Sequence, residues 1–157
     1  MFDVEEALTA FRAGLAVDSL STANSWYTGL GQVLAWRGDA AGARAAMERQ
    51  AALRESDTLG FYSSGMETIA LARGGRAKEA RARLEQRRTA IQRGWKGEYF
   101  LADAFASLGE ADSAFAWLDR GVARRRSPLE IPQDPFLAPL HSDPRYLALL
   151  KRVGLRP

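Results

Sequence analysis

The sequence predicts an all-α protein, a right-handed α-α superhelix of stacked helical hairpins closed by a C-terminal capping helix. Two observations predict this fold class. Alanines recur at the same place in four successive helical stretches, at spacings of 36, 37 and 34 residues (Ala7, Ala43, Ala80 and Ala114), and repeats of this length are typical of helix-pair solenoids. Tight glycine breaks also follow alternate helical stretches, at Gly38, Gly74-Gly75 and Gly109, and short connections make antiparallel neighbours.

The composition fits one folded domain without cysteine chemistry. The chain has 157 residues, 46% of them hydrophobic, and a net charge of +3. It contains no cysteine and a single histidine, His141, which excludes disulfides, thiol catalysis and thiolate metal sites and leaves a multi-histidine site unsupported. The N-terminus lacks the pattern of a signal peptide, and no apolar run is long enough to span a membrane. We therefore expect a soluble, cytoplasmic protein with no membrane partner.

Three helices are predicted in the first third of the chain. The first runs from Asp3, its expected N-cap, to about Val17, and one apolar stripe at helical spacing marks its inner face: Val4, Ala7, Leu8, Phe11 and Leu15. The second covers residues 26–36, with Asn24 or Ser25 as its cap. The third covers residues 40–54 and carries small residues and Met47 along its inner edge.

Four further helices and a different C-terminal segment follow. The predicted helices run from about residue 58 to 73, 77–93, 98–108 and 111–125. Four prolines within residues 127–139 exclude a long helix there. Asp143 and Pro144 then open a last helix, because Asp is a strong N-cap and Pro is favoured at the first helical position. We therefore divide the chain into about three and a half hairpins over 1–126 and a proline-rich link with a capping helix over 127–157.

One stretch carries a known repeat pattern. Tyr27-x2-Leu30-Gly31-x2-Leu34, followed by Gly38-Asp39 and Ala43-x3-Met47, resembles the tetratricopeptide repeat. Leu101-Ala102-x2-Phe105 with Gly109-Glu110 and Ala114-x3-Leu118 is similar, Thr68-x2-Leu71 with Gly75-Arg76 and Ala80-x3-Leu84 less so, and Ala7-x3-Phe11 resembles half a repeat. Small residues at positions 31 and 102 should let a neighbouring helix approach, and the bulky residue four after each alanine should fill the gap beside it.

The C-terminal segment carries a second resemblance. Residues 134–155 look like the end of bacterial multidomain proteins that pair a kinase, cyclase or DNA-binding output domain with a tetratricopeptide array. This resemblance implies that residues 1–157 form the last third or less of a longer protein, and the half-repeat at the start points the same way.

The resemblance to tetratricopeptide proteins implies a non-enzymatic scaffold, a regulatory tail that binds a protein or peptide partner. In that family the first helix of each hairpin lines a concave groove. Carried over by position, the groove residues are Thr28, Gln32, Trp36, Tyr62, Ile69, Arg73, Lys96, Tyr99 and Asp103. Aromatic side chains together with Arg73 and Lys96 would suit an extended peptide with acidic groups. We predict no catalytic residue, no metal site and no cofactor.

Two alternatives remain open. The stripe of Val4, Leu8, Phe11 and Leu15 on the first helix could be exposed and bury itself against a second copy, which would make the chain a homo-oligomerisation module. The block from Arg73 to Arg93 holds eight Lys or Arg against two Glu and could bind nucleic acid weakly. A solvated helix face is the simpler interpretation of that block, because its arginines spread around the helix with few aromatics between them.

Overall fold

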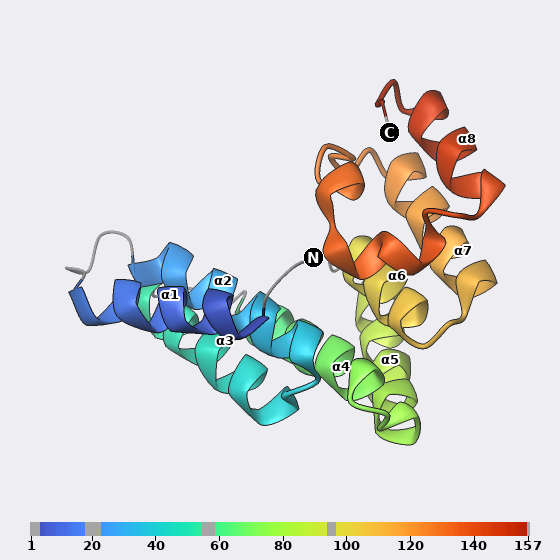
Figure 1. The fold of residues 1–157 in the computed structure, drawn as a ribbon. Coiled ribbons are helices and arrows are strands. Elements are labelled where there is room, and N and C mark those ends of the chain that lie inside the picture. The colour runs from blue at the N-terminus through green and yellow to red at the C-terminus, as the bar shows by residue number, and fades with distance from the viewer. Residues whose placement is uncertain (1–3, 18–22, 55–58, 94–96, 157) are drawn as a thin grey trace. The chain divides into compact units, whose positions relative to one another are not determined.

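A computed structural model describes residues 4–17, 23–54, 59–93 and 97–156 (Figure 1). Within these ranges every regular element is helical and none is a strand, which confirms the predicted all-α class. The elements are α1 (Val4–Val17), α2 (Ala23–Arg37), α3 (Ala40–Arg54), α4 (Leu59–Arg73), α5 (Ala77–Gln92), α6 (Glu98–Ser107), α7 (Ala111–Ala123), the 3-10 helices η1 (Ile131–Gln133) and η2 (Pro135–Leu140), and α8 (Pro144–Arg152). Asp3, the expected N-cap of the first helix, and residue 58, where we expected the fourth helix to begin, lie outside the described ranges.

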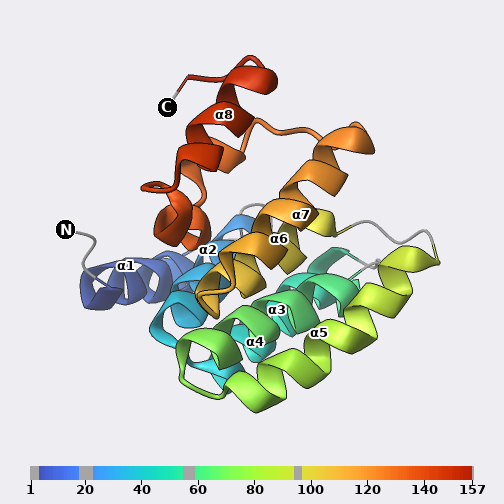
Figure 2. The same cartoon turned by 90° about the vertical axis from the view of Figure 1, so that its right-hand side faces the viewer.

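The backbone contacts divide the chain within α5 into two compact units, Met1–Arg83 and Leu84–Pro157, which we describe separately. In the first unit α2 packs against α1, α3 and α4, and α3 packs against α4 (Figure 2). Because α2 begins at Ala23, Asn24 and Ser25 lie inside the helix that we expected them to cap. None of the described helices is long and apolar enough to cross a membrane.

Small residues bring the helices of the first unit together. A Cβ atom added to Gly31 of α2 would lie 2.7 Å from Sδ of Met47 on α3, so the expected close approach of a neighbouring helix at Gly31 is confirmed. Gly29, on the same helix, is covered by the Phe11 ring, 2.2 Å from such a Cβ atom. The Phe11 and Trp26 rings meet edge to face, 5.9 Å apart. Side chains from α1 and α3 thus fill the space beside the glycines of α2.

The glycine turns at residues 38, 75 and 109 share one backbone geometry. Each glycine has a positive φ, of 85°, 77° and 76° respectively, which glycine adopts without steric cost. In each turn the N–H of the residue after the glycine donates to the carbonyl five residues earlier, at 2.9 Å: Asp39 to Leu34, Arg76 to Leu71, and Glu110 to Phe105. This is the bond pattern of the Schellman motif, which satisfies carbonyls left open at a helix end.

The same turns explain the regular alanines. The residue after each turn glycine, whose N–H closes one helix, also begins the next helix, because its carbonyl accepts a hydrogen bond from the N–H of the alanine four residues later. The three bonds run from Ala43 to Asp39 (2.9 Å), from Ala80 to Arg76 (3.0 Å) and from Ala114 to Glu110 (3.0 Å). Each of these alanines follows its turn glycine by five residues and is fully buried. The repeated alanine is therefore the first fully buried residue that follows each turn, where only a small side chain leaves room for the partner helix.

Two turn glycines of the first unit touch through their backbones. A Cβ atom added to Gly38 would lie 2.8 Å from Cα and 2.9 Å from N of Gly74. A Cβ atom added to Gly74 would in turn lie 2.9 Å from the Gly38 carbonyl oxygen. The end of the α2–α3 hairpin and the end of α4 therefore approach closely enough to exclude any side chain at either position.

The second unit has a core shared by α6, α7, η2 and α8. The fully buried leucines of these elements are Leu101, Leu118, Leu137, Leu140 and Leu150, and Leu84 of α5 is also fully buried. The Tyr146 hydroxyl of α8 donates to the Ile131 carbonyl of η1 at 3.0 Å, which ties the proline-rich segment to the last helix. As predicted, that segment forms only short 3-10 helices.

Helix α8 lies along α7 in the same direction (Figure 1). Arg145 at its start pairs with Asp112 at 2.6 Å and lies 4.4 Å from the Phe115 ring centre, and Arg152 at its end pairs with Asp119. Asp143 caps α8 by accepting from the Arg145 N–H at 2.9 Å, with Pro144 at the first helical position. The predicted start of this helix is confirmed.

Candidate functional site

Two of the predicted groove residues of the first unit meet across α2 and α4. The Arg73 guanidinium carbon lies 3.7 Å from the centre of the Trp36 ring, and Arg73 Nε donates to the Trp36 carbonyl at 2.7 Å. Both side chains are half-buried. Stacking fixes the plane of the guanidinium, and the Nε bond fixes its rotation within that plane. Burial lowers the pKa of Arg73 below its ordinary value.

The other predicted groove residues of the first unit differ in their exposure. Gln32 lies one turn before Trp36 on α2 and is exposed. Thr28 is half-buried and accepts a hydrogen bond from Gln50 Nε2 of α3 at 3.1 Å. Ile69 is fully buried, so its prediction as a groove residue is wrong: its side chain packs in the core. The Tyr62 side chain lies outside the described residues.

In the second unit the predicted groove residues serve packing. Tyr99 is half-buried, its hydroxyl donates to the Arg126 carbonyl at 3.3 Å, and its ring covers Gly121 of α7. Asp103 is only 3% exposed, because η2 packs against α6. The prediction that Asp103 lines an open groove is therefore wrong. Lys96 lies outside the described residues.

Two carboxyl groups have raised pKa values where η2 packs against α6: Asp103 of α6 and Asp134 at the start of η2. Burial, reinforced by Asp134 and Glu130, raises the pKa of Asp103 well above its ordinary value. Burial and Glu130 raise the pKa of Asp134 to about 6, against the opposing effect of the hydrogen bond from the Phe136 N–H. Asp103 Oδ1 and Ser107 Oγ, one turn apart, have no hydrogen-bond partner among the described residues. The helix η2 therefore covers a face of α6 that contains unpaired polar atoms.

Replacing Asp103 with asparagine should flatten the pH dependence of stability. A carboxyl group whose pKa is raised on folding stabilises the folded state fully below its unfolded pKa, and that contribution is lost as pH rises through the folded pKa. For Asp134 the stability is lost between about pH 4, its unfolded pKa, and about pH 6, its folded pKa. For Asp103 the loss also occurs above its unfolded pKa. We expect Asp103→Asn to raise the free energy of unfolding at pH 7.5 by about 2 kcal/mol, with little change at pH 4.

Urea unfolding at the two pH values measures this effect. Asp119→Asn is the matched control, because Asp119 is an exposed aspartate on α7. An Asp103→Asn protein that loses as much stability as the wild type between pH 4 and pH 7.5 would contradict the assignment.

A buried ion cluster in the second unit was not foreseen from the sequence. The Glu98 side chain is fully buried and pairs with Arg124 Nη1 at 3.0 Å and Arg126 Nε at 3.1 Å. Arg124 Nη1 also donates to the Ile91 carbonyl at 3.4 Å, so the cluster joins the ends of α5 and α7 to the start of α6. Burial alone would raise the pKa of Glu98, but backbone N–H groups and the two arginines hold it below its ordinary value.

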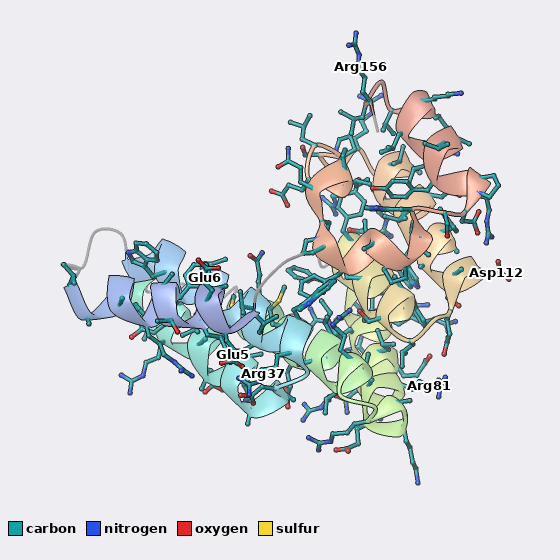
Figure 3. All side chains as sticks on the ribbon, in the orientation of Figure 1. Glu5, Glu6, Arg37, Arg81, Asp112 and Arg156 are labelled. Atoms are coloured by element: carbon teal, nitrogen blue, oxygen red, sulfur yellow. The ribbon has the colours of Figure 1, made fainter. Side chains whose placement is uncertain are left out.

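The apolar stripe on α1 is not an open face. Leu8 is fully buried, and Val4, Phe11 and Leu15 are half-buried. The expectation of an exposed stripe is therefore wrong for Leu8, because α1 packs against α2. Glu5 of α1 also pairs with Arg37 of α2 at 2.9 Å (Figure 3).

The basic block is not a continuous row of free cations. Arg76 pairs with Glu79 at 2.6 Å, Arg83 with Glu67 at 3.4 Å, and Arg88 with Glu85 at 3.5 Å. Arg87 is 5% exposed, and its guanidinium carbon lies 6.0 Å from the centre of the Phe100 ring. Nucleic-acid binding draws its affinity from cations that are free to neutralise phosphates, so these pairings do not favour that alternative.

No family model, no curated protein and no solved structure matches the chain. Among the described residues, no group of three or more His, Cys, Asp or Glu side chains is arranged to hold a metal ion. The site with the most defined geometry among the predicted residues is the contact of Trp36 with Arg73.

Proposed function

We propose that the chain is a protein-interaction module of tetratricopeptide-like hairpins, regulatory and not itself catalytic, which binds an extended peptide along α2 and α4. The observation that carries this proposal is the meeting of Trp36 and Arg73 across these two neighbouring helices, with exposed Gln32 one turn away. A rigid aromatic beside fixed polar groups is the composition of peptide-binding hot spots.

Three further observations support the hairpin part of the proposal. The turns at residues 38, 75 and 109 have the same hydrogen bonds, each is followed after five residues by a buried alanine, and Met47 fills the space beside Gly31. Equivalent turns at near-regular spacing are what a helical-repeat architecture requires.

Selection of a phage-displayed random dodecapeptide library on the purified chain tests the proposal. We expect selected peptides to shift the backbone NMR signals of α2 and α4, and Gln32→Arg and Trp36→Ala to weaken their binding about tenfold or more. Lys78→Ala, on the exposed surface of α5, is the control and should bind normally. Failure to select any peptide, or peptides whose binding both site variants leave unchanged, would overturn the proposal.

A further inference from the structure

Arg73 is a half-buried arginine that has no carboxylate partner among the described residues. Arg37, Arg44, Arg76 and Arg83 each pair with a glutamate, and their side chains are 41–54% exposed. Arg73 is less exposed than these, yet among the described residues it makes no ion pair. Its single protein hydrogen bond uses Nε, so both terminal nitrogens retain their donors.

A half-buried cation without a counter-charge is partly desolvated, and the geometry of the Arg73 guanidinium is already fixed. Desolvating a cation costs free energy unless an anion or hydrogen bonds compensate. The Trp36 ring at 3.7 Å and the Trp36 carbonyl at 2.7 Å hold the guanidinium in one orientation. An anion that binds there would gain a charge-assisted hydrogen bond without ordering a flexible side chain.

We propose that Arg73, stacked on Trp36, is a subsite for a carboxylate group of an acidic peptide, an inference that rests on the proposed peptide-binding function. The planar fork of a guanidinium matches the two oxygens of a carboxylate. Gln32, exposed one turn earlier on α2, supplies an amide that can hydrogen-bond to the backbone of the same peptide. The partner segment therefore presents an Asp or Glu side chain at the position that meets Arg73.

A nucleic acid fits this subsite less well than a peptide. Phosphate backbones are bound by several unpaired cations in a row, whereas Arg37 and Arg76, near Arg73, already pair with Glu5 and Glu79. One fixed guanidinium among neutralised neighbours is suited to one carboxylate presented at a defined position.

Two blocked hexapeptides test the subsite, one containing four glutamates and the other four glutamines at the same positions. The readouts are the Arg73 Nε–H and Trp36 indole NMR signals of the full chain during titration. We expect the glutamate peptide to bind at least tenfold more tightly than the glutamine peptide and to shift both signals. Arg73→Gln should abolish that difference, and Arg73→Lys, which keeps the charge but not the fork, should reduce it severalfold. Arg76→Gln is the matched control and should leave it unchanged.

Thermal unfolding of each variant checks that the fold is kept, and Arg73→Lys carries the test if Arg73→Gln does not fold. Equal affinity for the two peptides overturns the subsite, as does an acidic preference that survives both Arg73 variants. Inorganic phosphate that shifts the two signals as strongly as the glutamate peptide at equal concentration also overturns it. If library peptides map to α2 and α4 without acidic preference, the subsite fails and the proposed function stands.

Discussion

Gly38→Ala should lower the free energy of unfolding by about 3 kcal/mol, which sums two separate penalties. The first is conformational, because Gly38 has a φ of 85° and an L-residue in this region costs about 1 kcal/mol. The second is steric, because the new Cβ would lie 2.8 Å from the Gly74 Cα. The obstacle is backbone, so no side-chain rotation can relieve it.

Gly75→Ala separates the two penalties. Gly75 has a φ of 77°, but a Cβ atom there has nothing within 4 Å, so we expect only the conformational loss of about 1 kcal/mol. Urea unfolding followed by circular dichroism gives both values on the same scale. Equal losses for Gly38→Ala and Gly75→Ala would show that the two turns do not approach as closely as the structure places them.

Glu98→Gln should destabilise the chain by about 3 kcal/mol, because it removes one partner of a buried ion cluster. The amide keeps the size of the side chain but can no longer accept from both Arg124 and Arg126, which lie 3.0 and 3.1 Å from the carboxylate. The arginines are 33% and 27% exposed and can turn partly to water, which keeps the loss at the lower end of the range for buried pairs.

The pH dependence of the loss identifies its cause. Glu98 has a lowered pKa in the folded state, so its contribution is present above the unfolded pKa of about 4.3 and is lost as pH falls through the folded value. The difference between wild type and Glu98→Gln should therefore shrink in acid. Glu79→Gln, at an exposed pair with Arg76, should cost much less than Glu98→Gln, because solvent screens exposed ion pairs. If Glu98→Gln lowers the free energy of unfolding at pH 3 as much as at neutral pH, the effect comes from packing and not from the charge of Glu98.

The local features of the fold could be predicted from the sequence. The glycine breaks, the phase of the alanines, the close approach of a helix at Gly31 and the start of α8 at Asp143 all depend on residues close in sequence or on one helical repeat. Each follows from a rule of backbone geometry or residue size. Arg73 and Trp36 were predicted to lie in the same groove, but their direct contact was not predicted, because the sequence does not show how the guanidinium is oriented.

The parts that could not be predicted depend on segments distant in sequence. Asp103 occupies a position that the resemblance to tetratricopeptide repeats assigns to an open groove, but η2, about thirty residues later, covers that face. Ile69 is buried because its side chain enters the core of the first unit. The Glu98 cluster joins residues 26 and 28 positions apart. Hydrophobic periodicity identifies the faces of a helix, and only the tertiary arrangement decides which of them meet solvent.

In each turn a single residue makes both the last hydrogen bond of one helix and the first hydrogen bond of the next, so the connection between paired helices cannot be lengthened without losing a bond. Asp39, Arg76 and Glu110 each close one helix with their N–H and open the next with their carbonyl, so an inserted residue would break one bond or the other. We therefore expect an insertion or deletion to be tolerated only between a buried alanine and the next turn glycine. The unequal spacings of this chain follow that rule: 32 residues separate Ala43 from Gly75 but 29 separate Ala80 from Gly109, while the step from glycine to alanine stays at five.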